Sequence, residues 1–401
     1  MVKRGPVLML VENMSVPLDR RVWPECRALR EAGYEVVVVC PRGREVDVAP
    51  LEVVDGVEIH RFPSASGDGT LDFLREYVCA FWHVFRLARR LGRTRTFAVV
   101  HAANPPDFLL LAAIPLKRRG ATFVFDHHDL FPELYLTRFG GSRNVGYWLA
   151  LALERLSFKL ADIVLSTNES YRRIAIERGR KRPEEVFVVR NAPDVSRFRP
   201  ANPDPQLRRG KEHLLAYVGV MARQDGVDGA LRALRILRDR RDDWHAIFAG
   251  DGDAYDDVRR LATQLGLDDV VEFTGFLHDR AAITRILSSA DVCLAPEPKD
   301  PLNDASTLIK IGEYMAAGRP IVSFDLQESR ITAGEAALYA EPNDESSFAA
   351  GIDELLDDQE RRSRMGELGR KRVEQLYSWE HSKAALLAVY ERAVSGNGWI
   401  P

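Results

Sequence analysis

Short hydrophobic runs alternate with longer amphipathic segments along most of the chain. Runs such as EVVVVC (35–40) and HAIFAG (245–250) are continuous, which is typical of strands buried on both faces of a parallel sheet. The segments between such runs repeat hydrophobic residues at helical spacing. In 19–33, for example, Asp19 is the expected N-cap and Gly33 the expected stop. We predict strands at 7–11, 35–40, 97–102, 122–127, 162–167, 185–191, 214–219, 245–250, 270–275, 291–296 and 320–324.

This alternation breaks once, in a segment at 192–212 that contains four prolines and has no periodicity. A chain of 401 residues is also too long for one ordinary core. Repeated β–α units predict the α/β class, with two doubly wound, Rossmann-like parallel sheets. We expect one domain at 1–195, joined by the C-terminal helix 380–401, and a second at 196–379.

Composition limits the choice of cellular compartment and of partners. Hydrophobic residues make up 46% and charged residues 29%, as in soluble globular proteins. The four cysteines form no close pair, which argues against a disulfide framework or a zinc site and for a reducing compartment. No hydrophobic run has the length of a signal-peptide core or a membrane span. We expect a cytoplasmic protein that is either free or peripheral on the inner face of the membrane.

Charge is divided unevenly along the chain. Residues 1–190 carry 29 Lys and Arg against 23 Asp and Glu, whereas the remainder carries 27 against 36. One interpretation is that the excess charges of each half simply lie on solvent-exposed faces. The other is that the first domain contacts an anionic surface, such as phospholipid headgroups or a phosphate-bearing acceptor. The basic, aromatic segment at 73–95, with Trp82 among its aromatic residues, would then lie at a lipid surface, unless it packs its aromatic residues on the sheet.

Ligands of open parallel sheets bind beyond the carboxyl ends of the strands. If the rims of the two sheets face each other, the substrates lie between them. In the first domain, polar residues follow the strands. In the second domain, glycine-rich turns follow the strands. The polar residues of the first domain are Asn13, Ser15, Asn104, Asp107, His128 and Asp129, and the turns of the second contain Gly219, Gly250, Gly275 and Phe276.

The stretch NDASTLIKIGEYMAAGRPIV (303–322) predicts a loop, a helix and a strand. A helix that begins near Ser306 or Thr307 buries Leu308 and places Lys310 and Glu313 on another face. Its first-turn N–H groups and the lysine would hold a diphosphate, and Glu313 would accept hydrogen bonds from a ribose. The competing interpretation is a capped helix with a Lys–Glu pair on its surface.

A set of motifs that follow one another along most of the chain bears on this choice. KIGEYMAAGRPIVSF resembles the nucleotide-binding helix of retaining GT-B glycosyltransferases of family 4. The other motifs that are similar to this family are DRRVWPECRALREAGYEVVVVCP, DHHDLFPELY, VVRNAPDVSRFRP, YVGVMARQDGVDGALRAL, FAGDGD, VEFTGFLHDRAAITRILSSADVCLAP and YSWEHSKAALLAVYERA.

The resemblance implies a site in which Lys310 and Glu313 bind the donor diphosphate and ribose. Backbone around Gly275 and Phe276 would hold the base, and His128, oriented by Asp129, would reach the sugar or its phosphate. Ser306, Thr307 and Leu308 would also line the donor site, and the acceptor side would contain Asn13, Ser15, Asn104 and Asp107. No metal or other cofactor is expected, because GDGD (250–253) is interpreted as a tight turn. The chain departs from the family at three positions. Ala305 replaces an acid, for which Asn303 or Asp304 would substitute, while Val220 and Asp225 replace two cations, for which Arg223 and Lys310 would substitute.

The resulting expectation is a retaining hexosyltransferase that uses a UDP-sugar or another nucleotide sugar. The acceptor would be a lipid-linked or polysaccharide-type intermediate in glycan biosynthesis, and no nucleic acid is involved. Three alternatives stay open: a soluble secondary-metabolite acceptor, a sugar-nucleotide epimerase of GT-B architecture that recruits Glu297 or Asp304, and a non-catalytic nucleotide-sugar-binding subunit. The sequence leaves open the donor sugar, the base, the linkage and the oligomeric state.

Overall fold

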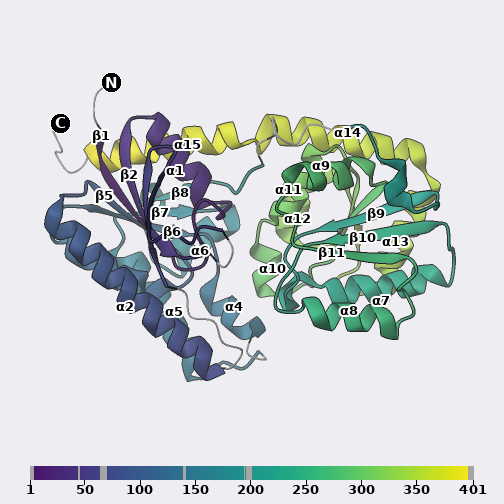
Figure 1. Cartoon of the computed structure of the whole chain (residues 1–401), viewed down its shortest axis with the longest axis horizontal. Helices are drawn as coiled ribbons and strands as arrows, with labels where there is room; N and C mark the ends of the chain where they lie inside the picture. The colour runs from purple at the N-terminus through teal and green to yellow at the C-terminus, as the bar shows by residue number, and fades with distance from the viewer. Residues whose placement is uncertain are drawn as a thin grey trace. The chain divides into compact units, whose positions relative to one another are not determined.

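The computed structural model describes residues 4–43, 46–63, 70–138, 141–193, 195 and 201–395. Contacts within the chain divide it into two compact units (Figure 1). Unit 1 comprises Met1–Arg190 and Ser382–Pro401, and unit 2 comprises Asn191–His381. Part of the expected linker, residues 194 and 196–200, lies outside the described residues.

Unit 1 is an eight-stranded sheet in the order β3-β4-β2-β1-β5-β6-β7-β8, with helices on its faces. Every neighbouring pair is parallel except β3 and β4. The strands are β1 (Arg4–Leu10), β2 (Tyr34–Pro41), β3 (Leu51–Val54), β4 (Val57–Phe62), β5 (Val99–Ala103), β6 (Thr122–His127), β7 (Ile163–Ser166) and β8 (Val186–Val188). The helices are α1 (Val22–Glu31), α2 (Thr70–Thr94), η1 (Asp107–Leu109), α3 (Leu110–Lys117), α4 (Phe131–Arg138), α5 (Val145–Leu160), α6 (Glu169–Glu177) and η2 (Pro183–Glu185).

Unit 2 is a six-stranded, wholly parallel sheet in the order β11-β10-β9-β12-β13-β14. Its strands are β9 (His213–Val218), β10 (Trp244–Ala249), β11 (Val271–Gly275), β12 (Val292–Ala295), β13 (Ile321–Phe324) and β14 (Ala337–Ala340). Its helices are η3 (Pro205–Arg208), η4 (Arg223–Asp225), α7 (Val227–Arg238), α8 (Tyr255–Gln264), α9 (Arg280–Ser289), α10 (Pro301–Ala305), α11 (Ile309–Ala316), α12 (Gln327–Ala333), η5 (Gly334–Ala336), α13 (Glu345–Asp357) and α14 (Gln359–Leu376). The final helix, α15 (Trp379–Ser395), joins unit 1 from Ser382 onward.

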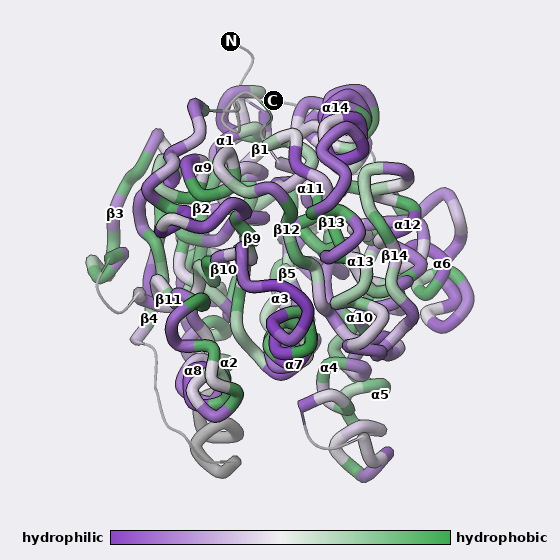
Figure 2. Tube along the Cα trace, turned by 90° about the vertical axis from the view of Figure 1, so that its right-hand side faces the viewer, coloured by the Kyte–Doolittle hydropathy of each residue, from purple (hydrophilic) through white to green (hydrophobic). Residues whose placement is uncertain are grey.

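Continuous hydrophobic runs fill both faces of the unit 2 sheet, because successive side chains of a strand point to opposite sides. On β9, Leu215 and Tyr217 join a core cluster with α7 and α13, whereas Leu214 and Ala216 join one with α9 and α11. The central strands are accordingly hydrophobic along their lengths in Figure 2. These two doubly wound sheets confirm the predicted α/β class and two-sheet architecture.

Each predicted strand is present, but three further strands were missed. β3 and β4 form a hairpin at the sheet edge around Asp55 and Gly56, both with positive φ (50° and 78°). An Asp-Gly pair between two β-forming runs is a hairpin signal, and β3 is too exposed to read as a buried strand. The third, β14, is only four residues long.

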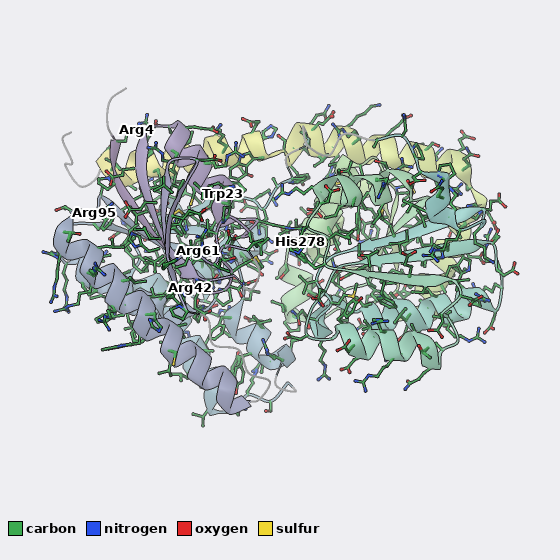
Figure 3. The ribbon with its side chains drawn as sticks, viewed as in Figure 1. Arg4, Trp23, Arg42, Arg61, Arg95 and His278 are labelled. Atoms are coloured by element: carbon green, nitrogen blue, oxygen red, sulfur yellow. The ribbon has the colours of Figure 1, made fainter. Side chains whose placement is uncertain are left out.

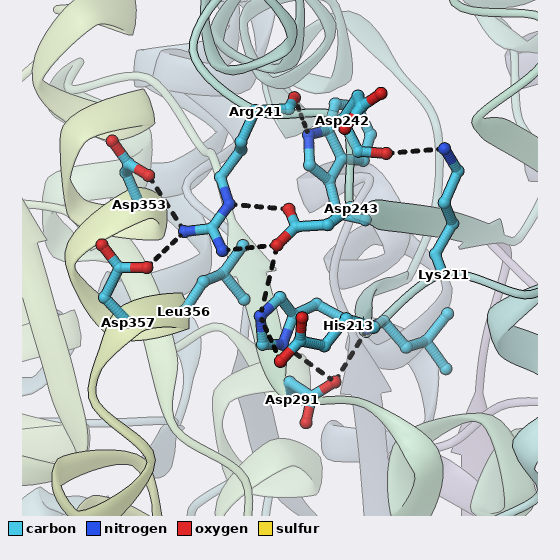
Figure 4. Close-up of polar contacts among 12 residues, drawn as sticks. Lys211, His213, Arg241, Asp242, Asp243, Asp291, Asp353, Leu356 and Asp357 are labelled. Atoms are coloured by element: carbon cyan, nitrogen blue, oxygen red, sulfur yellow. Dashed lines mark hydrogen bonds and ion pairs between the residues drawn. The ribbon is translucent and has the colours of Figure 1, made fainter.

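The amino edge of the unit 2 sheet is held by ion pairs around a single guanidinium (Figure 4). Arg241 donates to both oxygens of Asp243 at 2.8 Å, and to Asp353 at 3.1 Å and Asp357 at 2.8 Å. These contacts tie the start of β10 to α13. This edge has a structural role, which leaves the opposite, carboxyl edge for ligands.

Candidate functional site

Three glycine-containing loops lie side by side at the carboxyl edge of the unit 2 sheet. Backbone hydrogen bonds of 3.0 Å join Gly219 N to Ala249 O, Met221 N to Asp251 O and Gly250 N to Gly275 O. A Cβ at Gly250, whose φ is 148°, would overlap the carbonyl oxygen of Gly219. The loops after β9, β10 and β11 therefore form one backbone surface, as the positions of Gly219, Gly250 and Gly275 predicted.

Lys310 reaches this surface from the first turn of α11. Its ammonium hydrogen-bonds the carboxylate of Glu297 and the hydroxyl of Tyr217 (2.9 Å), and lies 3.5 Å from Asp225 Oδ1. A Cβ on Gly219 would be 3.0 Å from Lys310 Nζ. A buried cation thus lies against the loop that follows β9, at the position expected for a diphosphate.

This cluster contains two carboxyl groups and a single amine. Burial would lower the pKa of Lys310, but Glu297, Tyr217 and Asp225 together hold that pKa well above its usual value. Burial raises the pKa of Glu297 and of Asp225, against the opposing effect of Lys310. The ammonium therefore stays charged, while burial favours the protonated form of both acids.

The helix begins later than predicted. α11 starts at Ile309, with Leu308 as its N-cap, so Ser306 and Thr307 precede it in non-helical backbone. Ser306 N donates to Asn303 O at 3.2 Å, and Ser306 Oγ donates to Leu302 O at 2.6 Å. The predicted first-turn donors are thus wrong, because the polar run NDA belongs to the short helix α10, which Asp300 caps through Asn303 N.

Neither Lys310 nor Glu313 forms a surface pair. Lys310 is 8% exposed and Glu313 6%, and the ion-pair partners of Lys310 are Glu297 and Asp225. Every residue from Lys310 to Ala316 is buried. Tyr314 fixes the helix against the sheet, since its hydroxyl accepts from Val218 N (2.9 Å) and donates to Leu294 O (3.1 Å). The competing interpretation, an exposed Lys–Glu pair, is therefore wrong.

Two residues proposed to replace the missing acid at Ala305 are engaged elsewhere. Asn303 is buried and donates through Nδ2 to Gln224 O and Pro298 O, both at 2.9 Å. Asp304 Oδ1 accepts from Gln327 N at 2.8 Å. In this structure both side chains hold loops together, and their binding to a donor sugar is not supported by these contacts.

Arg223 and Phe276 are on the surface of the same edge. Arg223 is exposed at the start of η4, and no hydrogen bond or ion pair engages it within the described part of the chain. Phe276 is 47% exposed and lies edge-on to His278, with ring centroids 4.8 Å apart. Both are accessible to a ligand.

The Asp-x-Asp of GDGD lies in a tight turn, where Asp251 Oδ1 accepts from Gly252 N at 2.8 Å. Over the described residues, two groups bring three ligand atoms within 4.8 Å, and neither includes this turn. One, Glu212–His213–Asp243, belongs to the amino edge. In the other, Glu25–His101–Asp126, a guanidinium already occupies both oxygens of Asp126. A cation adjacent to a metal site would oppose metal binding.

In unit 1, Asn104 ties together the loops after β5 and β6. Its Oδ1 accepts from His128 N (2.9 Å) and Asp129 N (3.0 Å), and its Nδ2 donates to Asp107 Oδ1 (2.9 Å) and Asp129 O (2.8 Å). Burial raises the pKa of Asp107 well above its usual value. Both residues are fully buried, so they position His128 and Asp129 from behind, and the predicted acceptor contact is not supported.

The carboxylate that orients His128 is Asp126, and the predicted partner, Asp129, is wrong. His128 Nδ1 lies 3.2 Å from Asp126 Oδ2. Arg21 clamps the same carboxylate, with Nε to Oδ2 at 2.7 Å and Nη2 to Oδ1 at 2.5 Å. Burial would raise the pKa of Asp126, but Arg21 and His128 hold it well below its usual range. Burial would lower the pKa of His128, but Asp126 raises it.

Two further buried ionisable residues lie beside this clamp. Glu25 Oε1 is 3.5 Å from Arg21 Nη2, and its Oε2 is 3.8 Å from His101 Nε2. Burial raises the pKa of Glu25 to about 7. His101 Nδ1 lies 2.7 Å from the hydroxyl of Tyr390 on α15. Asp126 lies inside the hydrophobic run TFVFDH, and this signal was missed. Arg21 and Glu25 lie in an amphipathic segment, where the sequence does not set them apart from surface charges.

The loop after β1 contains the other two predicted residues. Ser15 is buried, and its Oγ donates to Asp47 Oδ2 at 3.0 Å. Arg61, labelled in Figure 3, donates to Val16 O at 2.7 Å and so fixes the same loop. Asn13 is exposed at the edge of the sheet. Of the pair, only Asn13 presents its side chain to solvent.

Comparison with known proteins identifies the class. The family model described as "Glycosyl transferase 4-like domain" matches residues 18–192, and that described as "Glycosyl transferases group 1" matches residues 212–358. With its two parallel-sheet α/β units, the chain is a GT-B glycosyltransferase. It belongs to the group 1, family 4-like glycosyltransferases, as the sequence motifs indicated.

Individual relatives agree with this assignment. A glycogen synthase of Mycobacterium tuberculosis is 27% identical over 401 residues, covering 94% of this chain and 92% of its own. Sucrose-phosphate synthase from Thermosynechococcus elongatus superposes with a TM-score of 0.81 at 18% identity, over 98% of this chain and all of its own. Anabaena HepE, solved with UDP and glucose, gives 0.70 at 15% identity, over 97% of this chain and all of its own. The chain is therefore a transferase enzyme.

Proposed function

We propose that this glycosyltransferase is a retaining enzyme that takes its sugar from a UDP-sugar. The observation that carries the proposal is the buried ammonium of Lys310 against Gly219, beside three backbone loops at the carboxyl edge of the unit 2 sheet. The complex of Anabaena HepE with UDP supports the choice of base. A diphosphate at this edge would gain a charge-assisted hydrogen bond from Lys310 and a second cation from Arg223.

The remaining donor contacts follow from the order of groups along a nucleotide. Glu313 follows Lys310 by three residues, about one helical turn further along α11. Phe276 is exposed, and aromatic rings of this kind stack on bases. We assign the ribose to Glu313 and the base to the loop at Gly275 and Phe276.

In this proposal the chemistry needs no dedicated protein base. The acceptor hydroxyl attacks on the face from which the diphosphate leaves, and its proton passes to the departing phosphate oxygen. The protein then supplies position and charge. Lys310 and Arg223 offset the growing charge on the diphosphate. His128, oriented by Asp126, is assigned to the donor sugar or its phosphate.

The epimerase alternative recruits Glu297 or Asp304 as an acid–base group. Glu297 is bound to Lys310, and Asp304 accepts from the backbone of α12, so both carboxylates already have partners. Their engagement favours transfer over epimerisation.

We further propose that the acceptor is a lipid-linked or oligosaccharide intermediate reached at the inner face of a membrane. Within the described residues, no helix has the length and hydropathy to cross a bilayer. The exposed arginines of α2 have no hydrogen-bond or ion-pair partner in that part of the chain, so they are available to phosphate groups. These are Arg86, Arg89, Arg90 and Arg93. Phe81 packs inward on Phe108, with ring centroids 5.6 Å apart, whereas Trp82 is 60% exposed.

The proposal is tested by thermal-shift measurement with a panel of nucleotide sugars, followed by product analysis with membrane extract. Free UDP together with a glycosylated lipid, with the anomeric configuration of the donor retained, is the expected result. An isomerised sugar nucleotide, or binding without any product, would contradict it.

A further inference from the structure

Helix α5 is hydrophobic on two opposite sides. Its inward residues include Tyr147, Ala150, Leu151 and Phe158, all of them buried. Its outward residues are also hydrophobic: Val145 is 85% exposed, Leu149 60%, Trp148 54% and Leu156 38%, and Ala152 is exposed between them.

The outward residues form one continuous stripe. At 3.6 residues per turn, positions 145, 148, 149, 152 and 156 fall within an arc of about 100°, opposite the buried arc. A hydrophobic stripe of that width is what a helix normally turns toward a core. A helix that is hydrophobic on two sides is expected to be covered on both, yet among the described residues this one is covered only on its inner side.

The charges around the stripe have a single sign. Arg155 lies beside the stripe and Lys159 at its carboxyl end; both are exposed, and neither has a hydrogen-bond or ion-pair partner among the described residues. Glu154, the acid of this helix, is buried and accepts from Arg178 Nη2 at 2.6 Å. Arg143, just before the helix, is exposed and lies over the ring of Tyr147. The exposed charges of α5 and its amino flank are all basic.

We propose that the outward face of α5, defined as Val145, Trp148, Leu149, Ala152 and Leu156, docks into the interface of an anionic membrane. A hydrophobic stripe with tryptophan and basic flanks matches helices that lie in the plane of the headgroups. The tryptophan and the aliphatic side chains would enter the boundary of the acyl chains. Arg155 and Lys159 would meet lipid phosphates. This inference rests on the proposed membrane-borne acceptor.

A second element of unit 1 supports the same orientation. The exposed face of α2 carries Val78 and Trp82, each 60% exposed. They are followed by exposed arginines that have no hydrogen-bond or ion-pair partner in the described part of the chain. In Figure 1, α2 and α5 both extend to the lower side of unit 1. One lipid surface on that side would accept both tryptophans.

Charge also argues against a second copy of the chain as the occupant. A symmetric dimer places the same patch on both partners. Arg155 and Lys159 would then approach basic residues of the facing helix, with no exposed acid on α5 to pair with them. Like charges juxtaposed across an interface are unfavourable, whereas an anionic bilayer complements them.

The test is co-sedimentation of the full chain with vesicles of phosphatidylglycerol and phosphatidylcholine in equal parts, and with vesicles of phosphatidylcholine alone. We expect binding to the anionic vesicles, weakened by salt. The double variant Trp148→Glu/Leu149→Glu should bind at least about tenfold more weakly, because it removes two hydrophobic side chains that the membrane would bury and adds charge of the same sign as the lipid. Leu376→Glu on α14, at a leucine 52% exposed in unit 2, is the matched control and should bind as the wild type does.

Three outcomes would overturn the proposal. These are no binding to anionic vesicles, equal loss in the control variant, and a dimer seen by sedimentation velocity that only the double variant disrupts. UDP affinity in solution is measured on the same proteins and should be unchanged. If the wild type binds UDP and transfers sugar to a detergent-dispersed acceptor but does not bind vesicles, the membrane-docking proposal fails and the proposed glycosyl transfer stands. If the wild type does not bind UDP, only the proposed function is refuted.

Discussion

Replacing Lys310 separates its two roles, as counter-ion to buried acids and as ligand for a diphosphate. Lys310→Met keeps most of the side-chain volume and leaves Glu297 and Asp225 without their cation. Removing one partner of a buried ion pair costs about 3–5 kcal/mol if the other stays charged. Because burial already raises the pKa of both acids, they can take up a proton instead, and we expect a smaller loss of stability.

Binding should respond differently from stability. A hydrogen bond to a charged group contributes about 1.5–3 kcal/mol, so Lys310→Met should weaken UDP binding about 10- to 150-fold. Adding Glu297→Gln removes the unpaired acid and should restore part of the thermal stability, but none of the affinity. Lys371→Met, at an exposed lysine of α14, should change neither.

Isothermal titration with UDP and thermal melts followed by circular dichroism measure the two effects on the same samples. The reasoning is refuted if Lys310→Met binds UDP within about twofold of the wild type. It is also refuted if the double variant regains full affinity, because Lys310 would then act only as a counter-ion.

Three other changes test separate parts of the account. Glu313→Ala should weaken binding of UDP more than that of inorganic diphosphate, since it loses only the ribose contact; equal effects on both ligands would argue against a ribose role. Asn104→Ala should lower sugar transfer by about tenfold with UDP affinity unchanged, because it frees the loop of His128; kinetics with saturating donor decide this, and a parallel loss of affinity would contradict it. Burial raises the folded-state pKa of Glu25 to about 7 from 4.5, so the folded state holds its proton and this contribution to stability is lost as pH rises through 7. The free energy of unfolding of Glu25→Gln, relative to that of the wild type, should therefore rise by on the order of 3 kcal/mol from pH 5 to pH 8. Urea unfolding of both proteins measures this difference, and a difference that is the same at the two pH values would contradict the reasoning.

The sheets were predictable because buried parallel strands leave continuous hydrophobic runs. The β3–β4 hairpin was missed because it is an exposed edge with little such signal, although Asp55-Gly56 marked its turn. The start of α11 was misplaced because Ser306 and Thr307 look like caps. The structure instead places a separate short helix before them, capped by Asp300.

The sequence predicted where the candidate site lies, but it did not predict which side chains contact each other there. Sequence spacing cannot tell which face of α11 is buried, so a surface Lys310–Glu313 pair stayed open as the competing interpretation. The acid at Glu297 was not recognised as the partner of Lys310. Adjacency suggested Asp129 as the partner of His128. Side chains two apart along an extended chain share a side, which favours Asp126, and that signal was available in DHHD.

The central claim is that a diphosphate binds at the amino end of α11, beside Lys310 and Gly219. A crystal structure of the chain with UDP tests it most directly. We predict a phosphate oxygen within hydrogen-bond distance of Lys310 Nζ, and the ribose hydroxyls on Glu313. Ordered UDP elsewhere, with Lys310 still bound to Glu297 and Tyr217, would contradict the account.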